Sequence, residues 1–165
     1  MTDEVSNAGS PTAEPRFIPA GEGRTVWLGD VYTVKLDAQA SAGGLTLIDV
    51  SVPPGSGPPL HVHADAAEVF YVLSGELDIT VGDKSYRAGP GDTVYVPPNV
   101  PHQFRNNGLH TARQLLMYTP AGFEKFFLEA GQEATPGTLP PAFDPQDGPR
   151  VAELGVRHQM FYRGF

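Results

Sequence analysis

Residues 55–75 read GSGPPLHVHADAAEVFYVLSG, and this stretch decides the fold. His61 and His63 are two residues apart, so on a strand both imidazoles lie on the same face. Glu68 opens the apolar run that follows, after a step short enough to be a turn between two strands. The stretch therefore predicts two successive strands that bring two imidazoles beside one carboxylate.

A third histidine follows in PPNVPHQFRN (97–106), where His102 comes just after a turn bracketed by prolines. Three imidazoles and one carboxylate are donors that suit Zn, Fe, Mn, Co or Ni, and four protein ligands leave one or two coordination positions free. A carboxylate at Glu68 without a partner would be costly to bury in an apolar strand. We therefore expect His61, His63, Glu68 and His102 to bind one divalent transition metal that substrate can reach.

Short β-branched or alternating runs, each bounded by Gly, Pro, Asn or Asp, recur on both sides of this stretch. They predict strands at 26–28, 31–36, 45–52, 68–73, 77–81, 84–88, 93–96, 102–106 and 112–119. The run EVFYVL is apolar on both faces, which predicts a strand covered on both sides by the barrel interior and by a second sheet or a partner subunit. Nine strands with no helix between them exclude alternating β-α-β units and favour a sandwich or a closed barrel.

The two ends of the chain are expected to be less regular. Residues 1–15 are polar and predict a loose arm, and 16–165 predict a single domain with its barrel core at about 25–119. A helix is expected at about 120–130, capped by Thr119 and ended by Gly131. Residues 131–165 then predict a Pro-rich tail with one short helical turn at 150–154.

Composition excludes several classes of function. Nineteen acidic against eleven basic residues give a net charge of −8, which repels nucleic-acid phosphates and anionic membranes. The chain has no Cys, which excludes disulfides, thiolate metal sites and cysteine nucleophiles. The longest apolar run, VFYVL, is too short for a membrane helix, and the N-terminus has no secretion-signal pattern. We expect a soluble, cytoplasmic protein that binds neither nucleic acid nor membrane.

The sequence closely resembles the cupin superfamily. Gly55, His61, His63, Glu68 and Gly75 match every position of the first cupin motif, G(x)5HxH(x)4E(x)6G. The second motif, G(x)5PxG(x)2H(x)3N, is met by Gly91, Pro97, His102 and Asn106, with Asn99 in place of the usual Gly. Asn tolerates a positive φ, so the turn can survive this change. The resemblance implies an all-β jelly-roll barrel (double-stranded β-helix) with one short C-terminal helix.

Within this superfamily, the chain looks most like small single-domain cupins of the quercetin 2,3-dioxygenase type. The resemblance implies a metal held by the four ligands that binds a flavonol, or a related enolizable phenol, through its deprotonated hydroxyl. Dioxygen then adds across the activated ring, which opens with loss of carbon monoxide. Glu68 would be both a ligand and the base that takes the hydroxyl proton.

Strand parity suggests a pocket for the small aromatic substrate. If Glu68 and His102 point into the barrel, Phe70 and Phe104 point with them. Met117 or Leu115, with Phe123 and Phe127 of the expected helix, could complete an apolar cavity and screen it from water; the alternative is that these residues are ordinary core.

Two other functions fit the same residues. One is a metal-dependent isomerase or polyketide cyclase that consumes no dioxygen, and the other is a non-catalytic cupin that binds a small ligand or sugar. We expect Asn106 to be structural and His110 and His158 not to be ligands. The doubly apolar strand at 68–73 is compatible with a homodimer formed by packed sheets.

Overall fold

The computed structural model describes residues 13–163. Most of the arm expected at 1–15 lies outside these residues, and 13–19 belong to no helix or strand. Neither helix in the described part of the chain has the length or apolar composition to cross a lipid bilayer.

The fold consists of two antiparallel sheets. The larger sheet has seven strands in the order β11-β1-β2-β3-β10-β5-β8, and the smaller has five in the order β12-β4-β9-β6-β7. In chain order the strands are β1 (Arg24–Leu28), β2 (Asp30–Leu36), β3 (Thr46–Val52), β4 (His61–His63), β5 (Ala67–Ser74), β6 (Leu77–Val81), β7 (Lys84–Ala88), β8 (Thr93–Val96), β9 (His102–Arg105), β10 (Ala112–Thr119), β11 (Gln132–Glu133) and β12 (Met160–Tyr162). The all-β jelly-roll barrel expected from the sequence is confirmed.

Alternation of apolar and polar residues places one face of each strand in the core. In β3, Thr46, Ile48, Val50 and Val52 are buried while the residues between them are only half-buried. This period-two pattern is the one that predicted the strand from sequence. The strands expected at 77–81, 84–88, 93–96 and 112–119 have the predicted bounds.

Strand β5 is covered on its inner face, as expected, while no second sheet of the described chain covers its outer face. Its inner residues, which include Phe70 and Val72, are buried, but Tyr71 on the outer face is 38% exposed and Val69 is half-buried. Because the run EVFYVL is apolar on both faces, a second sheet or a partner subunit was expected to cover its outer face. Within the described chain the outer face of β5 is instead partly open.

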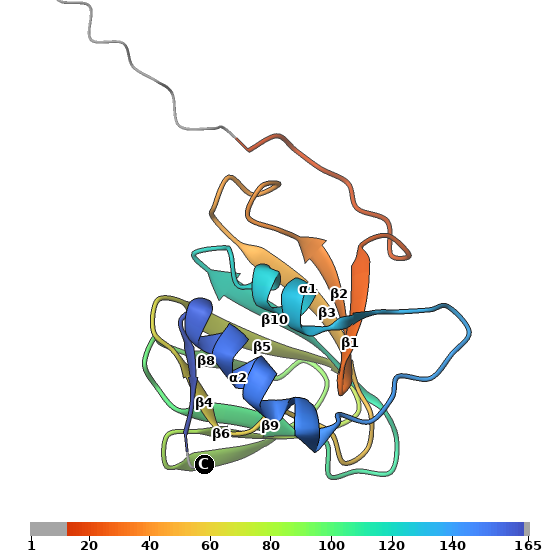
Figure 1. The fold of residues 1–165 in the computed structure, drawn as a ribbon, viewed down its shortest axis with the longest axis vertical. Helices are drawn as coiled ribbons and strands as arrows, with labels where there is room; N and C mark the ends of the chain where they lie inside the picture. The colour runs from red at the N-terminus through yellow and green to blue at the C-terminus, as the bar shows by residue number, and fades with distance from the viewer. Residues whose placement is uncertain (1–12, 164–165) are drawn as a thin grey trace, which may run out of the picture.

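The helices also differ from the expectation. Helix α1 spans Glu124–Ala130 and begins after Phe123 with no side-chain cap, because Gly122 has a φ of 132°, outside the helical range. The cap expected from Thr119 is therefore wrong, and its hydroxyl donates to the carbonyl of Gly44 instead. The short turn expected at 150–154 is a full helix, α2 (Gly148–Arg157), preceded by a 3-10 turn, η1 (Pro145–Asp147). Figure 1 shows α2 running diagonally across the front of the strands, with α1 next to β10.

Gly155 lies inside this helix, which continues past residue 154 to Arg157. A Cβ at Gly155 would stand 2.7 Å from Cε of Met160, so its small size lets the following strand β12 return close to the helix. Strand β12 then pairs with β4, in register from Met160 opposite His63 to Tyr162 opposite His61. The tail is therefore part of the barrel.

Glu124 fixes the start of α1 against the larger sheet. Its carboxylate is buried and accepts hydrogen bonds from the backbone N–H of Ala38 (3.0 Å) and of Gly122 (2.9 Å), and from the hydroxyl of Thr46. One side chain thus connects the helix to the turn after β2 and to the first residue of β3.

We expect Glu124→Ala to lower the free energy of unfolding by about 2 kcal/mol, because it removes the acceptor of the Ala38 N–H and of the buried Thr46 hydroxyl, while the N–H of Gly122 keeps the Thr46 hydroxyl as an acceptor. Glu129→Ala on the same helix is the matched control, because Glu129 is 48% exposed and its ion pairs with Arg157 and His158 are at the surface. Urea denaturation of the two variants measures the difference. Equal losses would contradict this role for Glu124.

Candidate metal centre

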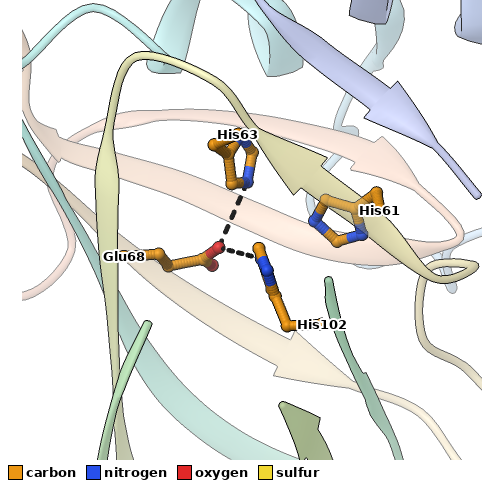
Figure 2. A group of neighbouring side chains, drawn as sticks. All are labelled: His61, His63, Glu68 and His102. Carbon is orange, nitrogen blue, oxygen red and sulfur yellow. Dashed lines mark hydrogen bonds and ion pairs between the residues drawn. The ribbon is translucent and has the colours of Figure 1, made fainter. Parts of the chain in front are cut away.

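The four residues expected to bind a metal converge in the barrel. His61 and His63 lie on β4, Glu68 on β5 and His102 on β9. One ligand atom from each lies within 4.8 Å of the others, and all four side chains are buried. Figure 2 shows the three imidazoles arranged around the Glu68 carboxylate.

Strand pairing and two pinned turns produce this convergence. His61 stands directly opposite His102 where β4 pairs with β9. Asn99, in the turn before His102, has a φ of 65° and donates its backbone N–H to the carbonyl of His63 (2.7 Å). The expected positive φ at Asn99 is confirmed, and the turn holds the third histidine against the strand that carries the first two.

The loop before His61 is fixed in the same way. Asn106 donates its side-chain amide to the carbonyls of Val52 and His110, both at 2.8 Å, and its backbone bonds to Gly55 and Ser56. The structural role expected for Asn106 is thus confirmed. A glycine is also needed at position 57, because a Cβ there would stand 2.1 Å from the carbonyl oxygen of Phe104.

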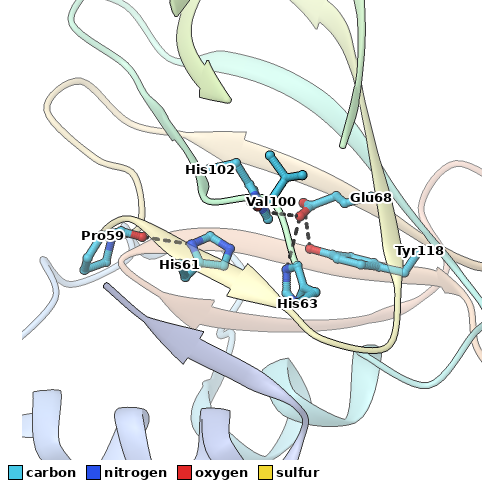
Figure 3. A network of polar contacts seen from close by, with 7 residues as sticks. All are labelled: Pro59, His61, His63, Glu68, Val100, His102 and Tyr118. Atoms are coloured by element: carbon cyan, nitrogen blue, oxygen red, sulfur yellow. Dashed lines mark hydrogen bonds and ion pairs between the residues drawn. The ribbon is translucent and has the colours of Figure 1, made fainter. Parts of the chain in front are cut away.

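Two of the imidazoles are oriented by backbone carbonyls. Nδ1 of His61 bonds to the carbonyl of Pro59 and Nδ1 of His102 to that of Val100, both at 2.8 Å (Figure 3). Because a carbonyl can only accept, each Nδ1 must carry the hydrogen. The Nε2 atom of each ring is then the one available to a cation, and such outer contacts are typical of metal-binding histidines.

Glu68 contacts most of the other polar side chains of the cluster. Its Oε2 lies 2.8 Å from Nε2 of His102 and 3.2 Å from Nε2 of His63. Its Oε1 accepts a hydrogen bond of 2.9 Å from the hydroxyl of Tyr118, as Figure 3 shows. Burial, followed by the charge of Glu68, raises the pKa of Tyr118, so this hydroxyl keeps its proton and donates.

The pKa values of the cluster are shifted by burial and by mutual interaction. Burial and the two neighbouring imidazoles lower the pKa of His61 to about 3, so this ring is neutral at pH 7. Burial opposes ionisation of Glu68, but the hydrogen bond from His102 and the adjacent His63 hold its pKa below the usual range. Burial likewise opposes protonation of His102, yet the bond to Glu68 raises its pKa. Glu68 and His102 therefore share a proton as a buried pair.

The residues fit a divalent transition metal. The set combines nitrogen and oxygen donors, and the Nε2 atoms and the carboxylate face one small volume. A cation bound there would replace the proton shared by Glu68 and His102, and would balance the buried carboxylate that otherwise has only that proton. The site therefore suits one divalent transition metal ion.

A cavity of about 630 Å³ adjoins the cluster and includes His61 and Glu68 in its wall. Of the five residues expected to line a pocket, Phe104, Phe123 and Phe127 do so. Phe70 does not line the cavity: it lies in the core between His102 and Phe104, with ring centroids about 6 Å from each.

Met117, or Leu115 as its alternative, was expected to line the cavity, and this expectation is wrong. On β10 the buried residues are Ala112, Gln114, Leu116 and Tyr118, so the odd-numbered residues face outward. The parity of this strand could not be fixed from its apolar residues, because both faces carry them. The observed parity brings Tyr118 directly opposite Glu68.

Sequence reasoning therefore missed Tyr118, and it also missed the contribution of β2. Asp30 and Tyr32 on β2 are buried and line the cavity. The alternation of DVYTVKL places both on one face, but nothing in the local sequence shows that this face meets the cluster. His110 is exposed, and His158 lies beside Glu129 at 3.3 Å, away from the four ligands.

Comparison with known proteins agrees with the fold. The cupin-domain family model matches residues 48–118. Quercetin 2,3-dioxygenase of Bacillus subtilis strain 168 is 31% identical over 109 residues, which are 66% of this chain and 32% of that protein. H2HPP isomerase of Bacillus subtilis is 41% identical over 56 residues, which are 33% of this chain and 23% of that protein. The chain thus spans at most about a third of either relative.

Among solved structures, an RmlC-like cupin from Shewanella frigidimarina superimposes with a TM-score of 0.59 at 18% identity, over 70% of this chain and 99% of that one. This likeness concerns the fold, which here positions both histidine-bearing strands. With both sequence motifs present, with the matching domain model and with the two-sheet barrel, the chain is a member of the cupin superfamily.

Proposed function

We propose that this cupin is a metal-dependent dioxygenase that cleaves a flavonol, or a related enolizable aromatic compound, with dioxygen. The observation that carries the proposal is a cluster of three histidines and one glutamate that opens on a cavity walled by aromatic side chains. The similarity to quercetin 2,3-dioxygenase supports it.

The cavity suits a flat aromatic ligand. Its volume of about 630 Å³ lies within the range of small-molecule sites, roughly 300 to 1,000 Å³. Phe123 lies against His63 with ring centroids 4.3 Å apart, and Phe127 stacks on Tyr32 at 4.2 Å. These rings would hold the ligand beside the cluster and exclude water from it.

The residues of the chain would hold the ligand and move one proton. A divalent metal bound by His61, His63, Glu68 and His102 would lower the pKa of a substrate enol placed beside it. The carboxylate of Glu68 would accept the proton of that hydroxyl. Because its pKa lies below the usual range, Glu68 is ionised at neutral pH but is a weak base. Tyr118 would keep the carboxylate oriented through Oε1.

The isomerase remains the second candidate, because the partial relative H2HPP isomerase has a higher identity over a shorter stretch. A metal-assisted proton transfer would need the same ligands and the same base, but no dioxygen. The two candidate functions therefore differ in the consumption of dioxygen, which can be measured directly.

We expect the chain reconstituted with one of Fe, Mn, Co, Ni or Zn to consume one dioxygen per quercetin, followed with an oxygen electrode and by loss of flavonol absorbance. The double variant His61→Ala, His63→Ala should lose this activity by more than about 100-fold, because it removes two ligands. Turnover of an enolizable substrate without dioxygen uptake would favour the isomerase. Ligand binding that persists unchanged in the double variant would favour a non-catalytic cupin.

Metal affinity should fall as the pH is lowered. The pKa of His102 is raised by its bond to Glu68, so a proton occupies this pair below that pKa and must leave when the metal binds. Zn affinity is expected to fall about tenfold per pH unit below the His102 pKa and to be flat above it. Calorimetry at several pH values, in buffers of different ionisation enthalpy, measures both the affinity and the released proton. A pH-independent affinity between pH 5 and 8 would contradict the shared proton.

We also propose that two copies pair through the outer face of the larger sheet. Met117, Val69 and Tyr95 lie side by side on β10, β5 and β8, and Leu115 lies beside Tyr71. Tyr95 is 60% exposed and Tyr71 38%. An apolar row across three strands is the type of surface that a second sheet covers.

Replacing Tyr71 and Tyr95 together by Lys should convert a dimer to a monomer, because each dimer would then bury four unpaired charges. Light scattering coupled to gel filtration measures the mass. Tyr86→Lys is the matched control, because Tyr86 is 45% exposed but lies on β7 of the other sheet. A wild-type chain that is monomeric at micromolar concentration would overturn this proposal.

A further inference from the structure

A second carboxylate lines the cavity that adjoins the metal centre. Asp30 is the first residue of β2 and is only 1% exposed. Its Oδ2 accepts a hydrogen bond of 3.1 Å from the hydroxyl of Tyr32. Its Oδ1 is buried and has no hydrogen-bond partner at normal distance among the residues that the structure describes, although the Ser56 hydroxyl lies close enough to favour the ionised carboxylate. One strong acceptor in the cavity wall is therefore unused.

Such an arrangement is costly for the protein. Burial raises the pKa of Asp30 to about 6, against the opposing effect of the Ser56 and Tyr32 hydroxyls and of Arg105. At neutral pH the side chain is nevertheless ionised, so the folded chain holds a buried charge with an unsatisfied oxygen. Buried carboxylates of this kind are concentrated at functional sites, where a ligand completes their hydrogen bonds.

Asp30 and the metal centre are separated along the larger sheet, because Tyr32 is level with Gln114 of β10 across β3, four residues from Tyr118, which stands opposite Glu68. Burial, followed by the charge of Asp30 and, more weakly, that of Glu68, raises the pKa of Tyr32, whose hydroxyl donates to Asp30. The ring of Tyr32 stacks on Phe127, in the aromatic wall of the same cavity. A ligand lying along this wall would have the metal-binding cluster at one end and Asp30 at the other.

The chemistry of Asp30 restricts what can lie at that end. An ionised carboxylate accepts hydrogen bonds and repels anions, so carboxylate and phosphate groups are disfavoured there. A purely apolar end would leave Oδ1 desolvated and without a partner. A neutral hydroxyl satisfies the carboxylate, and a bond between a hydroxyl and an ionised acceptor is stronger than one between neutral groups.

We propose that Asp30 determines substrate specificity by accepting, at Oδ1, a hydrogen bond from a hydroxyl group remote from the metal-binding end of an aromatic ligand. The inference rests on the proposed function, because the metal centre is taken to bind the enol at the other end. It narrows the substrate class from flavonols in general to flavonols that carry further hydroxyl groups.

The test compares two probes with the same metal-binding group. Quercetin and 3-hydroxyflavone share the 3-hydroxy-4-keto group, but only quercetin carries further hydroxyls. Dissociation constants are measured without dioxygen for the Zn-loaded full chain, because Zn has no redox chemistry, from the absorbance shift of the bound flavonol. The variants are Asp30→Asn, which keeps the shape of the side chain, and Asp30→Leu, which removes its acceptors.

The wild-type chain should bind quercetin at least about tenfold more tightly than 3-hydroxyflavone. This ratio of dissociation constants is what one hydrogen bond to a charged acceptor contributes. The preference should fall in Asp30→Asn and vanish in Asp30→Leu, while 3-hydroxyflavone binds all three chains with similar affinity. That unchanged affinity also shows that each variant is folded with its metal centre intact. The control variant is Asp49→Asn, on the neighbouring strand β3. Asp49 forms an ion pair with Arg113 at the surface, so this variant should keep the wild-type preference for quercetin.

The outcomes that overturn the inference distinguish a wrong role for Asp30 from a wrong function. If both flavonols bind in a metal-dependent way but Asp30→Leu keeps the preference for quercetin, or the wild type shows none, the proposed function stands and the role of Asp30 is wrong. If neither flavonol binds the Zn-loaded wild-type chain, the proposed function fails and the inference fails with it. If Asp30→Leu does not fold, a full preference in Asp30→Asn overturns it.

Discussion

Burial of one carboxylate among three imidazoles is the constraint on which the rest of the structure depends. All four side chains are buried, and an isolated charge in such a place is costly. The cluster reduces this cost because the proton between Glu68 and His102 links opposite charges and Tyr118 donates to the remaining carboxylate oxygen. Each of these contacts comes from a different strand, so the barrel must be closed before the charges are balanced.

The turns that close the barrel are held by backbone contacts. Asn99 ties the turn before His102 to the end of β4, and Asn106 ties the end of β9 to the loop that leads into β4. Gly57 allows this loop to lie directly on Phe104. The residues of the two motif stretches thus serve two purposes: the histidines and Glu68 form the site, while Gly57, Asn99 and Asn106 set the distance between its two halves.

The sequence predicted the parts of the fold that local pattern encodes. Short β-branched or alternating runs located the strands from β1 to β10 other than β4, and the spacing of His61, His63, Glu68 and His102 located β4 and the four ligands. Residues whose role depends on distant pairing were missed. Met117 was placed in the cavity because both faces of β10 are apolar, and Tyr118 was overlooked for the same reason. Asp30 and β12 could not be found, because only tertiary contacts bring them to the cavity and to β4.

The pairing of β12 with β4 has a consequence for the order in which the barrel is assembled. Strand β4 carries two of the ligands, yet its neighbours β9 and β12 both leave the ribosome long after it. Until they arrive, the peptide groups of β4 must be hydrated, and its histidines belong to a nascent chain rather than to a preformed cage. The four ligands are therefore assembled only after β9 has folded back onto β4, and pairing with β12 then covers the other edge of this strand.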